Sequence, residues 1–391
     1  MAIDSEGSII YGLDHQARCL CSVGGGESDR VQFLAGSQTL RHDQVNQIHL
    51  LELNDDLNGV RKTQFVHNVG EIWHLAACPD DDTIFASCHN SVDRNNVLTS
   101  GVTVWRMQYA DEIDNDTGIL HQLANFRATS PGETVACFEW QPSSSTSTKA
   151  FVLHGRNELS VVDTNMDGLT LKPISTSCID SKSTGRVCAA RWDPHHHSNI
   201  VALVLDSTVR SIDIRSQTPA FSIDAAHQAG VRSLDFNPNR QYTLCTGGDD
   251  GKIRLWDVRS AASPLTTINT HSHWVWSVRY NPNHDQLLLS CSSDAQVCLH
   301  SVVSWCSEEI DGDNVDGAQS SDEEAHENVA VNDASSRLED GVLRCYEDHE
   351  ESVYACEWSQ SDAWVFASLS FDGRLIINKV PKSVKYKILK L

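Results

Sequence analysis

Four residues in one stretch of the sequence, His227, Thr246, Asp250 and Trp256, carry the side chains of a hydrogen-bonded relay. A histidine held between an aspartate and a hydroxyl is the arrangement that activates the nucleophile of many hydrolases. The same groups can also satisfy one another inside a β-sheet, because imidazole, hydroxyl, carboxylate and indole N–H offer matching donors and acceptors. Their place in a repeated motif, described next, favours a structural network over a catalytic site.

No other pattern predicts chemistry. The three consecutive histidines His195–His197 could suggest a metal, but successive side chains of a turn point in different directions, so we expect a surface turn. The glycines Gly24–Gly26 lack the GK[ST] that completes a phosphate loop. We expect no carboxylate cluster at a central channel. The sequence therefore predicts no catalytic residue, no cofactor and no metal site.

The relay lies in a motif that recurs along the chain. Segments beginning at His227, His271 and His349 share a valine four residues later, an alternating apolar strand that ends in an aromatic residue, a second strand, a turn aspartate and a third strand. The strand ends as aromatic-x-Pro in four copies, and 44 residues separate Pro194 from Pro238 and Pro238 from Pro282. Weaker copies lie upstream. The sixth and seventh copies carry His300 and Asn378 where the fifth has Trp256, so their networks should be weaker.

A period of about 40–45 residues with four short strands is typical of a WD-repeat β-propeller. Counting seven copies, we predict an all-β, seven-bladed propeller that forms a single domain over residues 1–391. Outer strands are expected at Val60–Val66, Gly118–Phe126 and Pro219–Ile223. The seventh copy ends at Val380 without an outer strand, and Ser8–Leu13 has no partner. We therefore expect the N-terminal strand to complete the last blade and leave no open edge.

An acidic segment, Ser307–Gly341, interrupts the repeats between the sixth and seventh blades. It has few large apolar residues and should form a disordered loop. Ser320 and Ser321 each have an acidic residue three positions later, which makes them candidate sites for an acidophilic kinase. The alternative, a loop that only solvates the surface, is the simpler interpretation.

Composition narrows the class of partner. The net charge of −23 argues against duplex nucleic acid or an anionic bilayer as the main partner, since both require a basic face. Thirteen cysteines without a CxxC pair fit reduced thiols in a cytoplasmic protein. Acidic residues near the N-terminus and short apolar runs predict neither a signal peptide nor a membrane span, so membrane recruitment should depend on partners.

One rim of the propeller offers a candidate partner-binding surface. Residues at positions i and i+2 of a strand share a face, so the motif HSHWVWSV places two tryptophans together. Clustered aromatic residues beside an arginine are typical of interface hot spots. Packing between blades is the alternative. The rim candidates are Glu71, Trp73, Arg232, Trp274, Trp276 and Tyr354.

Longer stretches of the sequence resemble the EARP and GARP complex-interacting protein family. They are IIYGLDHQAR (9–18), GEIWH (70–74), RWDPHH (191–196), DFNPNRQY (235–242), HSHWVWSVRYNPNHDQLLL (271–289) and FASLSFDGRLIINKVP (366–381). The resemblance implies a non-catalytic partner of the endosome-associated recycling and Golgi-associated retrograde tethering complexes. Such a protein supports recycling from endosomes to the plasma membrane and retrograde transport to the trans-Golgi network. It is cytoplasmic, monomeric apart from the complex, and recruited to these membranes through its partners.

A second hypothesis comes from the motif Trp256-Asp257-Val258-Arg259. This WDxR ending occurs in propellers that act as substrate receptors of cullin–RING ubiquitin ligases. Many WD repeats carry it by chance. An affinity pull-down separates the two hypotheses, since it recovers either tether subunits or a cullin adaptor.

Overall fold

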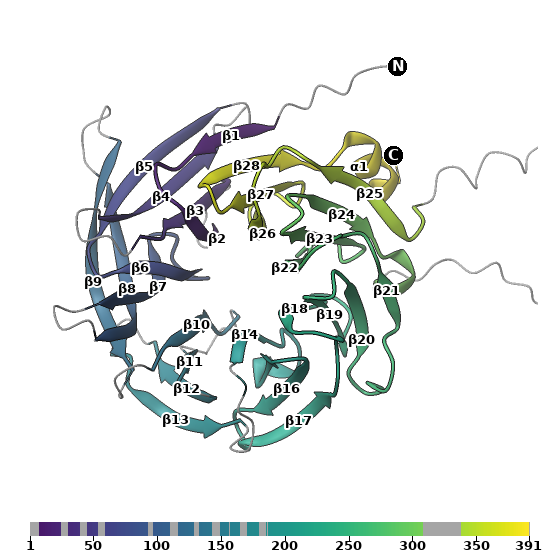
Figure 1. Ribbon diagram of the computed structural model, residues 1–391, viewed down its shortest axis with the longest axis horizontal. Helices are drawn as coiled ribbons and strands as arrows, with labels where there is room; N and C mark the ends of the chain where they lie inside the picture. Colours follow the sequence, from purple (N-terminus) through teal and green to yellow (C-terminus); the bar gives the residue numbers. More distant parts are fainter. Residues whose placement is uncertain are drawn as a thin grey trace, which may run out of the picture.

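The computed structural model describes residues 8–24, 30–39, 45–53, 59–92, 97–109, 116–128, 133–142, 149–155, 157–164, 170–179, 185, 187–307 and 338–390. Short strands are arranged around a central opening, with one strand of each sheet innermost (Figure 1). The candidate phosphorylation sites Ser320 and Ser321 lie outside the described residues, as does most of the acidic segment.

Among the described residues, the strands form five four-stranded sheets and one eight-stranded sheet. The eight-stranded sheet consists of β2 (Ala17–Val23), β3 (Gln32–Ser37), β4 (Asn46–Leu53), β5 (Val60–His67), β6 (Glu71–Ala77), β7 (Ile84–Val92), β8 (Leu98–Tyr109) and β9 (Thr117–Arg127). It divides into two antiparallel runs of four, because β5 and β9 meet in parallel at only two residue pairs. We count these two runs as the first and second sheets in chain order.

Four further sheets follow in chain order. Their strands are β10 (Val135–Trp140), β11 (Lys149–His154), β12 (Glu158–Asp163) and β13 (Pro173–Cys178); β14 (Val187–Trp192), β15 (Ile200–Leu205), β16 (Thr208–Asp213) and β17 (Thr218–Ile223); β18 (Val231–Phe236), β19 (Thr243–Gly248), β20 (Ile253–Asp257) and β21 (Thr266–Ile268); and β22 (Val275–Tyr280), β23 (Leu287–Ser292), β24 (Val297–Ser301) and β25 (Gly341–Tyr346). Two 3₁₀ turns, His196–Ser198 and Val303–Trp305, lie in the loops.

The last sheet joins the two ends of the chain. It contains β26 (Val353–Trp358), β27 (Val365–Ser370), β28 (Arg374–Lys379) and, as its outer strand, β1 (Ile9–Gly12). β1 pairs antiparallel with β28, with Ile9 opposite Ile377. This is the segment whose pairing the sequence analysis anticipated.

Apolar side chains fill the space between neighbouring sheets. Between the last sheet and the first, Phe33 and Ala17 pack with Val365, Leu375 and Ile377. Comparable clusters lie at the other junctions of the described sheets. A four-stranded sheet cannot cover both of its own faces, so each sheet depends on its neighbours to bury them.

Tryptophans at the ends of inner strands also join adjacent sheets. The indole of Trp140 donates a hydrogen bond to the carbonyl of Ala76 at 3.0 Å, and that of Trp358 donates to the carbonyl of Arg279 at 3.2 Å. The aromatic that ends the repeated strand therefore connects each of these sheets to the preceding one. Its partner is another inner strand, which the repeat itself does not reveal.

Each inner strand carries a β-bulge at the same place. The register shifts after the first residue in β2, β10, β14, β18, β22 and β26, and after the second residue in β6, which begins one residue earlier. A bulge leaves one residue outside the ladder and re-aims its side chain. The skipped residues are Arg18, Trp73, Ala136, Cys188, Arg232, Trp276 and Tyr354.

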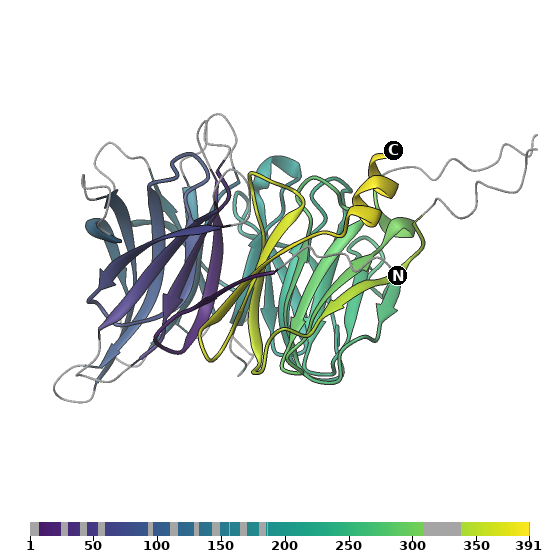
Figure 2. The same cartoon turned by 90° about the horizontal axis from the view of Figure 1, so that it is seen from above.

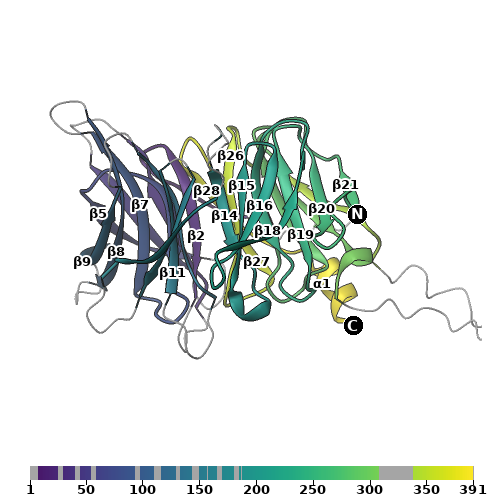
Figure 3. The ribbon, with the colours of Figure 1, turned by 90° about the horizontal axis from the view of Figure 1, so that it is seen from below.

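One expectation about the C-terminal third was wrong. The acidic segment does not lie between two sheets, because β25 follows it and pairs with β24 inside the sixth sheet. The insertion separates an outer strand from its partner by about forty residues of chain, so spacing alone does not associate the two. Helix α1 (Lys382–Leu389), which the repeat does not predict, follows β28 and packs Val384 and Ile388 into the core. Figures 2 and 3 show α1 at one face of the molecule, beside the ends of the neighbouring strands.

Candidate functional site

The seven skipped residues gather at one end of the central channel. They line a cavity of about 1060 Å³ whose walls are the inner strands. We call this end the mouth, and define it by Arg18, Trp73, Arg232, Trp276 and Tyr354 together with Trp274, which directly precedes β22. The bulges explain why such bulky side chains are presented here, because an unpaired residue is not restricted to the alternation of a regular strand.

Aromatic rings and guanidinium groups alternate in the mouth. The Arg18 guanidinium lies 5.0 Å from the centre of the Trp73 ring, 5.4 Å from Trp276 and 4.1 Å from Tyr354. The Trp276 and Tyr354 ring centroids are 4.7 Å apart, and those of Trp274 and Trp276 are 5.8 Å apart. Cation–π contacts of this kind hold the rings in fixed orientations.

The two arginines of the mouth differ in their partners. Arg232 forms a bidentate pair with Asp249 at 2.6 and 2.7 Å, and this hydrogen-bonded pair raises the pKa of the guanidinium. Arg18 makes no hydrogen bond or ion pair to a carboxylate within the described part of the chain. Partial burial lowers its pKa. Arg232 is therefore paired with a carboxylate of the chain, whereas Arg18 has no carboxylate partner among the described residues.

The rim candidates therefore lie together, but they are not equivalent. Trp73 and Trp274 are 39% and 41% exposed. Trp276 is more buried and donates its indole N–H to Ser293 at 2.6 Å. Glu71 is buried and accepts a hydrogen bond from the Trp73 indole at 2.6 Å. Trp73 and Trp274 are thus the aromatic residues that a partner could cover.

Arg18 was not among the predicted rim residues, because the weak first copy of the repeat obscures its alignment. The register shift shows that Arg18 occupies the same strand position as Trp73 and Trp276. The signal was present in the sequence ARCLCSV, where Arg18 follows the residue equivalent to Val275.

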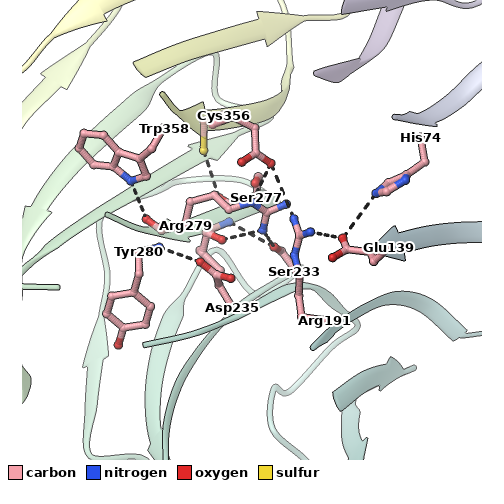
Figure 4. Close-up of polar contacts among 12 residues, drawn as sticks. His74, Glu139, Arg191, Ser233, Asp235, Ser277, Arg279, Tyr280, Cys356 and Trp358 are labelled. Atoms are coloured by element: carbon pink, nitrogen blue, oxygen red, sulfur yellow. Dashed lines mark hydrogen bonds and ion pairs between the residues drawn. The ribbon is translucent and has the colours of Figure 1, made fainter. Parts of the chain in front are cut away.

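Deeper in the channel, three residues further along the inner strands, lies a belt of charged side chains. It contains Glu139, Arg191, Asp235, Arg279 and Glu357, which alternate in sign over five consecutive sheets. Figure 4 shows the first four of these side chains. We call this belt the floor. At about 3.3 Å per strand residue, it lies roughly 10 Å below the mouth.

The floor is held together by ion pairs, one of which crosses the channel. Arg191 contacts Glu139 on the neighbouring sheet and lies 3.7 Å from Glu357, three sheets away. Arg279 donates to Glu357 at 2.8 Å and to the Ser233 hydroxyl at 3.2 Å. Every arginine of the floor thus has at least one carboxylate partner.

Burial determines the protonation behaviour of the floor. It raises the pKa of Glu139 and of Asp235, although the neighbouring arginines act in the opposite direction. Burial and then Arg191 lower the pKa of His74 to about 3, so this imidazole, 3.8 Å from Glu139, is neutral. Glu139 and Glu357 are engaged with guanidinium groups, and Asp235 accepts the backbone N–H of Tyr280 at 2.9 Å. This is an arrangement for holding strands rather than for general acid–base chemistry.

The floor corrects the expectation that no carboxylate cluster lies at the channel. Three carboxylates meet there, each just before the aromatic residue that ends its strand. The sequence carries the signal as EW, RW, DF, RY and EW in consecutive copies. Among the described residues, no group of three or more His, Cys, Asp or Glu side chains could hold a metal ion.

The four-residue relay forms a hydrogen-bonded network inside the fifth sheet. His227 contacts Asp250 at 2.7 Å and Thr246 at 2.8 Å, and the Trp256 indole donates to the same Thr246 hydroxyl at 3.0 Å. All four side chains are largely enclosed, and the network joins the turns to the strands. It lies behind the channel, where no substrate could reach it without opening the sheet.

The sixth and seventh sheets use different versions of this network. His271 contacts Asp294 at 3.0 Å and Ser290 at 2.7 Å, and His300 contacts the same Ser290 hydroxyl at 2.8 Å. In the seventh sheet, His349 contacts Ser368 at 2.8 Å and Ser370 at 2.9 Å instead of an aspartate.

The WDxR motif ends in a contact within its own loop. Arg259 donates to both carboxylate oxygens of Asp257, at 2.9 and 2.6 Å, and its guanidinium lies 4.7 Å from the centre of the Tyr242 ring. Its side chain remains 63% exposed. The histidine triplet forms a turn in which His195 contacts the Asn237 carbonyl and His196 the Tyr242 hydroxyl.

Radially arranged four-stranded sheets with this internal network define the class of protein, a WD-repeat β-propeller. Residues 5–300 match the family model described as EIPR1 beta-propeller, and residues 341–377 match the WD domain, G-beta repeat. The chain therefore belongs to the EIPR1 β-propeller family.

Named relatives cover the whole chain. It is 40% identical to the EARP-interacting protein homolog of Danio rerio and 39% identical to EARP and GARP complex-interacting protein 1 of Homo sapiens, in each case over 99% of this chain and 100% of the relative. It is 34% identical to EARP-interacting protein 1 of Caenorhabditis elegans, over 98% of this chain and 99% of the relative. Within the described residues, no helix has the length and apolar character needed to cross a bilayer.

Proposed function

We propose that this chain is a non-catalytic scaffold that binds the EARP and GARP tethering complexes. In this role it supports recycling from endosomes to the plasma membrane and retrograde transport to the trans-Golgi network. The names of full-length relatives at 39–40% identity support the partners. The pairing of the channel carboxylates with arginines supports a binding role over a catalytic one.

The binding unit in this proposal is a monomeric ring of seven blades that β1 closes. The pairing of β1 with β28 and the apolar cluster between the last and first sheets support closure. A ring without free edges is a rigid platform that needs no second copy to fold. The protein is cytoplasmic and reaches endosomes and the trans-Golgi network through its partners.

The observation that carries the proposal is the pair of exposed tryptophans at the mouth. Trp73 and Trp274 are large rings whose orientation is fixed by neighbouring guanidinium groups. Pre-positioned aromatic side chains lose little conformational entropy on binding and dominate many interfaces. We place the tether contact at this surface.

Co-purification from cells tests the proposal. The double variant Trp73→Ala, Trp274→Ala should lose EARP and GARP subunits while its melting temperature stays close to that of the original chain. Tyr386→Ala is the matched control, since this aromatic residue is 49% exposed on α1, away from the mouth. Unchanged recovery of tether subunits with the double variant would place the contact elsewhere.

The same experiment addresses the ubiquitin-ligase hypothesis. If a cullin adaptor is recovered in place of tether subunits, and is lost with Arg259→Ala, the scaffold proposal fails. Arg259 already satisfies Asp257 and covers Tyr242, which argues that the motif serves its own loop.

A further inference from the structure

The open donors of Arg18 indicate what kind of segment the mouth takes. We infer that Arg18 recognises an anion, and that the mouth binds an extended partner segment in which a carboxylate side chain lies next to a bulky apolar one. This inference rests on the proposed function only in taking the mouth as the partner surface. It adds the chemistry of the partner and the residue that reads it.

The geometry of Arg18 leaves its hydrogen-bond donors open. A guanidinium stacks on aromatic rings through its faces, and it donates hydrogen bonds through its edges. Trp73, Trp276 and Tyr354 all lie within 5.4 Å of the Arg18 guanidinium carbon and restrict its position. Within the described residues, no carboxylate accepts a hydrogen bond from its edge.

The other three arginines of the channel differ from Arg18 in having carboxylate partners. Arg232 uses both oxygens of Asp249, Arg191 contacts Glu139, and Arg279 contacts Glu357. Each of these cations is neutralised by a carboxylate of the chain itself. Arg18 is the exception, and a carboxylate from outside would complete it with the bidentate geometry that arginine favours.

The carboxylates near the mouth decide which charge a partner would meet. The acids nearest to the mouth are already engaged, since Glu71 accepts from Trp73 and Asp249 is held by Arg232. The buried Glu71 carboxylate acts on Arg18 only through its charge and accepts no hydrogen bond from the guanidinium, so the donors of Arg18 stay open although the whole chain has a net charge of −23. A basic segment would find no free carboxylate there, whereas an acidic segment finds Arg18.

The exposed rings of the mouth can bind the apolar part of the ligand. The Trp73 ring contacts Arg18 and the Trp274 ring contacts Arg232, and each tryptophan exposes about two fifths of its surface. A bulky apolar side chain beside the carboxylate can cover one of these rings. The cross-channel contact between Arg191 and Glu357 stands below, so the segment lies across the mouth and does not thread the channel.

A random peptide library displayed on phage, selected against the full chain, tests the inference. We expect enriched peptides to carry Asp or Glu adjacent to Trp, Phe or Leu. In the best synthetic peptide, replacing the acid by its amide should weaken binding at least tenfold, because a charge-assisted bidentate pair is lost. Enrichment of peptides without an acid, enrichment of basic peptides, or no enrichment at all would overturn the inference.

Variants of Arg18 locate the contact. Arg18→Gln should weaken the acidic peptide at least tenfold and leave the amide peptide unchanged, whereas Arg215→Gln, at an exposed site in the loop after β16, should change neither. Equal binding of the acidic peptide to the chain and to Arg18→Gln would overturn the assignment. If Arg18→Gln does not fold, Arg18→Met keeps an apolar stem among the rings and removes the cation, and its loss of the acid-to-amide preference serves as the same test.

The two proposals can fail separately. If Trp73→Ala, Trp274→Ala loses the tether complexes but Arg18→Gln retains them, the proposed function stands and the anion-reading role fails. If acidic peptides bind the mouth in an Arg18-dependent manner while tether recovery is unaffected by every mouth variant, the inference stands and the placement of the tether contact at the mouth fails. If no tether subunits are recovered even with the original chain, the proposed function fails.

Discussion

The mouth and the floor of the channel are built by the same inner strands, three residues apart, and they treat charge in opposite ways. On the floor, Arg191 and Arg279 are each paired with carboxylates of neighbouring or opposite sheets. At the mouth, Arg18 is surrounded by rings and has no carboxylate partner among the described residues. The arginines of the floor are paired with carboxylates of the chain, whereas Arg18 at the mouth is not.

This difference separates residues that maintain the fold from residues available for binding. A buried charge that loses its partner destabilises the folded state, so the floor should be sensitive to single substitutions. An exposed ring with few contacts contributes little to folding and much to an interface. Changes at the floor should therefore alter stability, and changes at the mouth should alter binding.

The largest effect that we expect is a loss of folding stability at acid pH, and it arises from buried histidines that lie outside the mouth. Burial lowers the pKa of His67 and His300 to about 3, and that of His49 and His349 to about 4. Their unfolded pKa is near 6.5, so the stability they contribute is present above that pH and is lost as the pH falls toward 4.

We expect a loss of several kcal/mol in the free energy of unfolding between pH 6.5 and pH 5, at roughly 1.4 kcal/mol per pKa unit for each site. Urea unfolding at a series of pH values measures it. His300→Gln should reduce the slope by part of one proton. A flat profile over this range would contradict the assignment of these histidines as neutral groups.

The next effect in size is the loss of a floor arginine. Arg191→Met leaves Glu139 without its guanidinium, and we expect the free energy of unfolding to fall by about 3 kcal/mol, the lower end for breaking a buried pair, because both groups retain some solvent contact. Peptide binding by the folded fraction should be unchanged. Arg215→Met is the exposed control. A loss below about 1 kcal/mol would show that the floor is solvated like a surface.

A smaller effect is expected from the network behind the channel. Thr246→Val preserves shape but leaves the His227 imidazole and the Trp256 indole N–H without their shared acceptor and donor. We expect a loss of about 2 kcal/mol, with binding at the mouth unchanged. Thr266→Val on the outer strand β21 serves as the control. Equal losses for the two variants would contradict a special role for the network.

The smallest effect is expected from the acidic segment. Its flanking residue Ser307 hydrogen-bonds to Asp285, in the loop that follows the end of β22 opposite the mouth. Replacing residues 308–337 by a six-residue Gly-Ser linker should change the free energy of unfolding by about 1 kcal/mol or less, because loop closure costs grow slowly with length. Calorimetry and peptide titration check it, and a large drop in either would show that the segment packs or binds.

Much of this architecture could be predicted from local sequence. The strand that begins with Val231 and ends with Phe236 alternates because its two faces meet different neighbours, and that alternation is visible in any copy. The network of His227, Thr246, Asp250 and Trp256 follows from fixed spacing within one repeat. Helix α1 was missed because only Val384 and Ile388 mark its buried face, too few to stand out from the preceding strand.

The sequence by itself determined which residues form the sheets and which side chains join strands within a sheet, since both depend on neighbours within a few tens of residues. Only the tertiary structure decided which side chains meet in the channel. Arg18 and Tyr354 stand near opposite ends of the chain, and Arg191 reaches Glu357 across the opening. These contacts depend on how the curved stack of sheets brings its ends together, and no local spacing encodes that curvature.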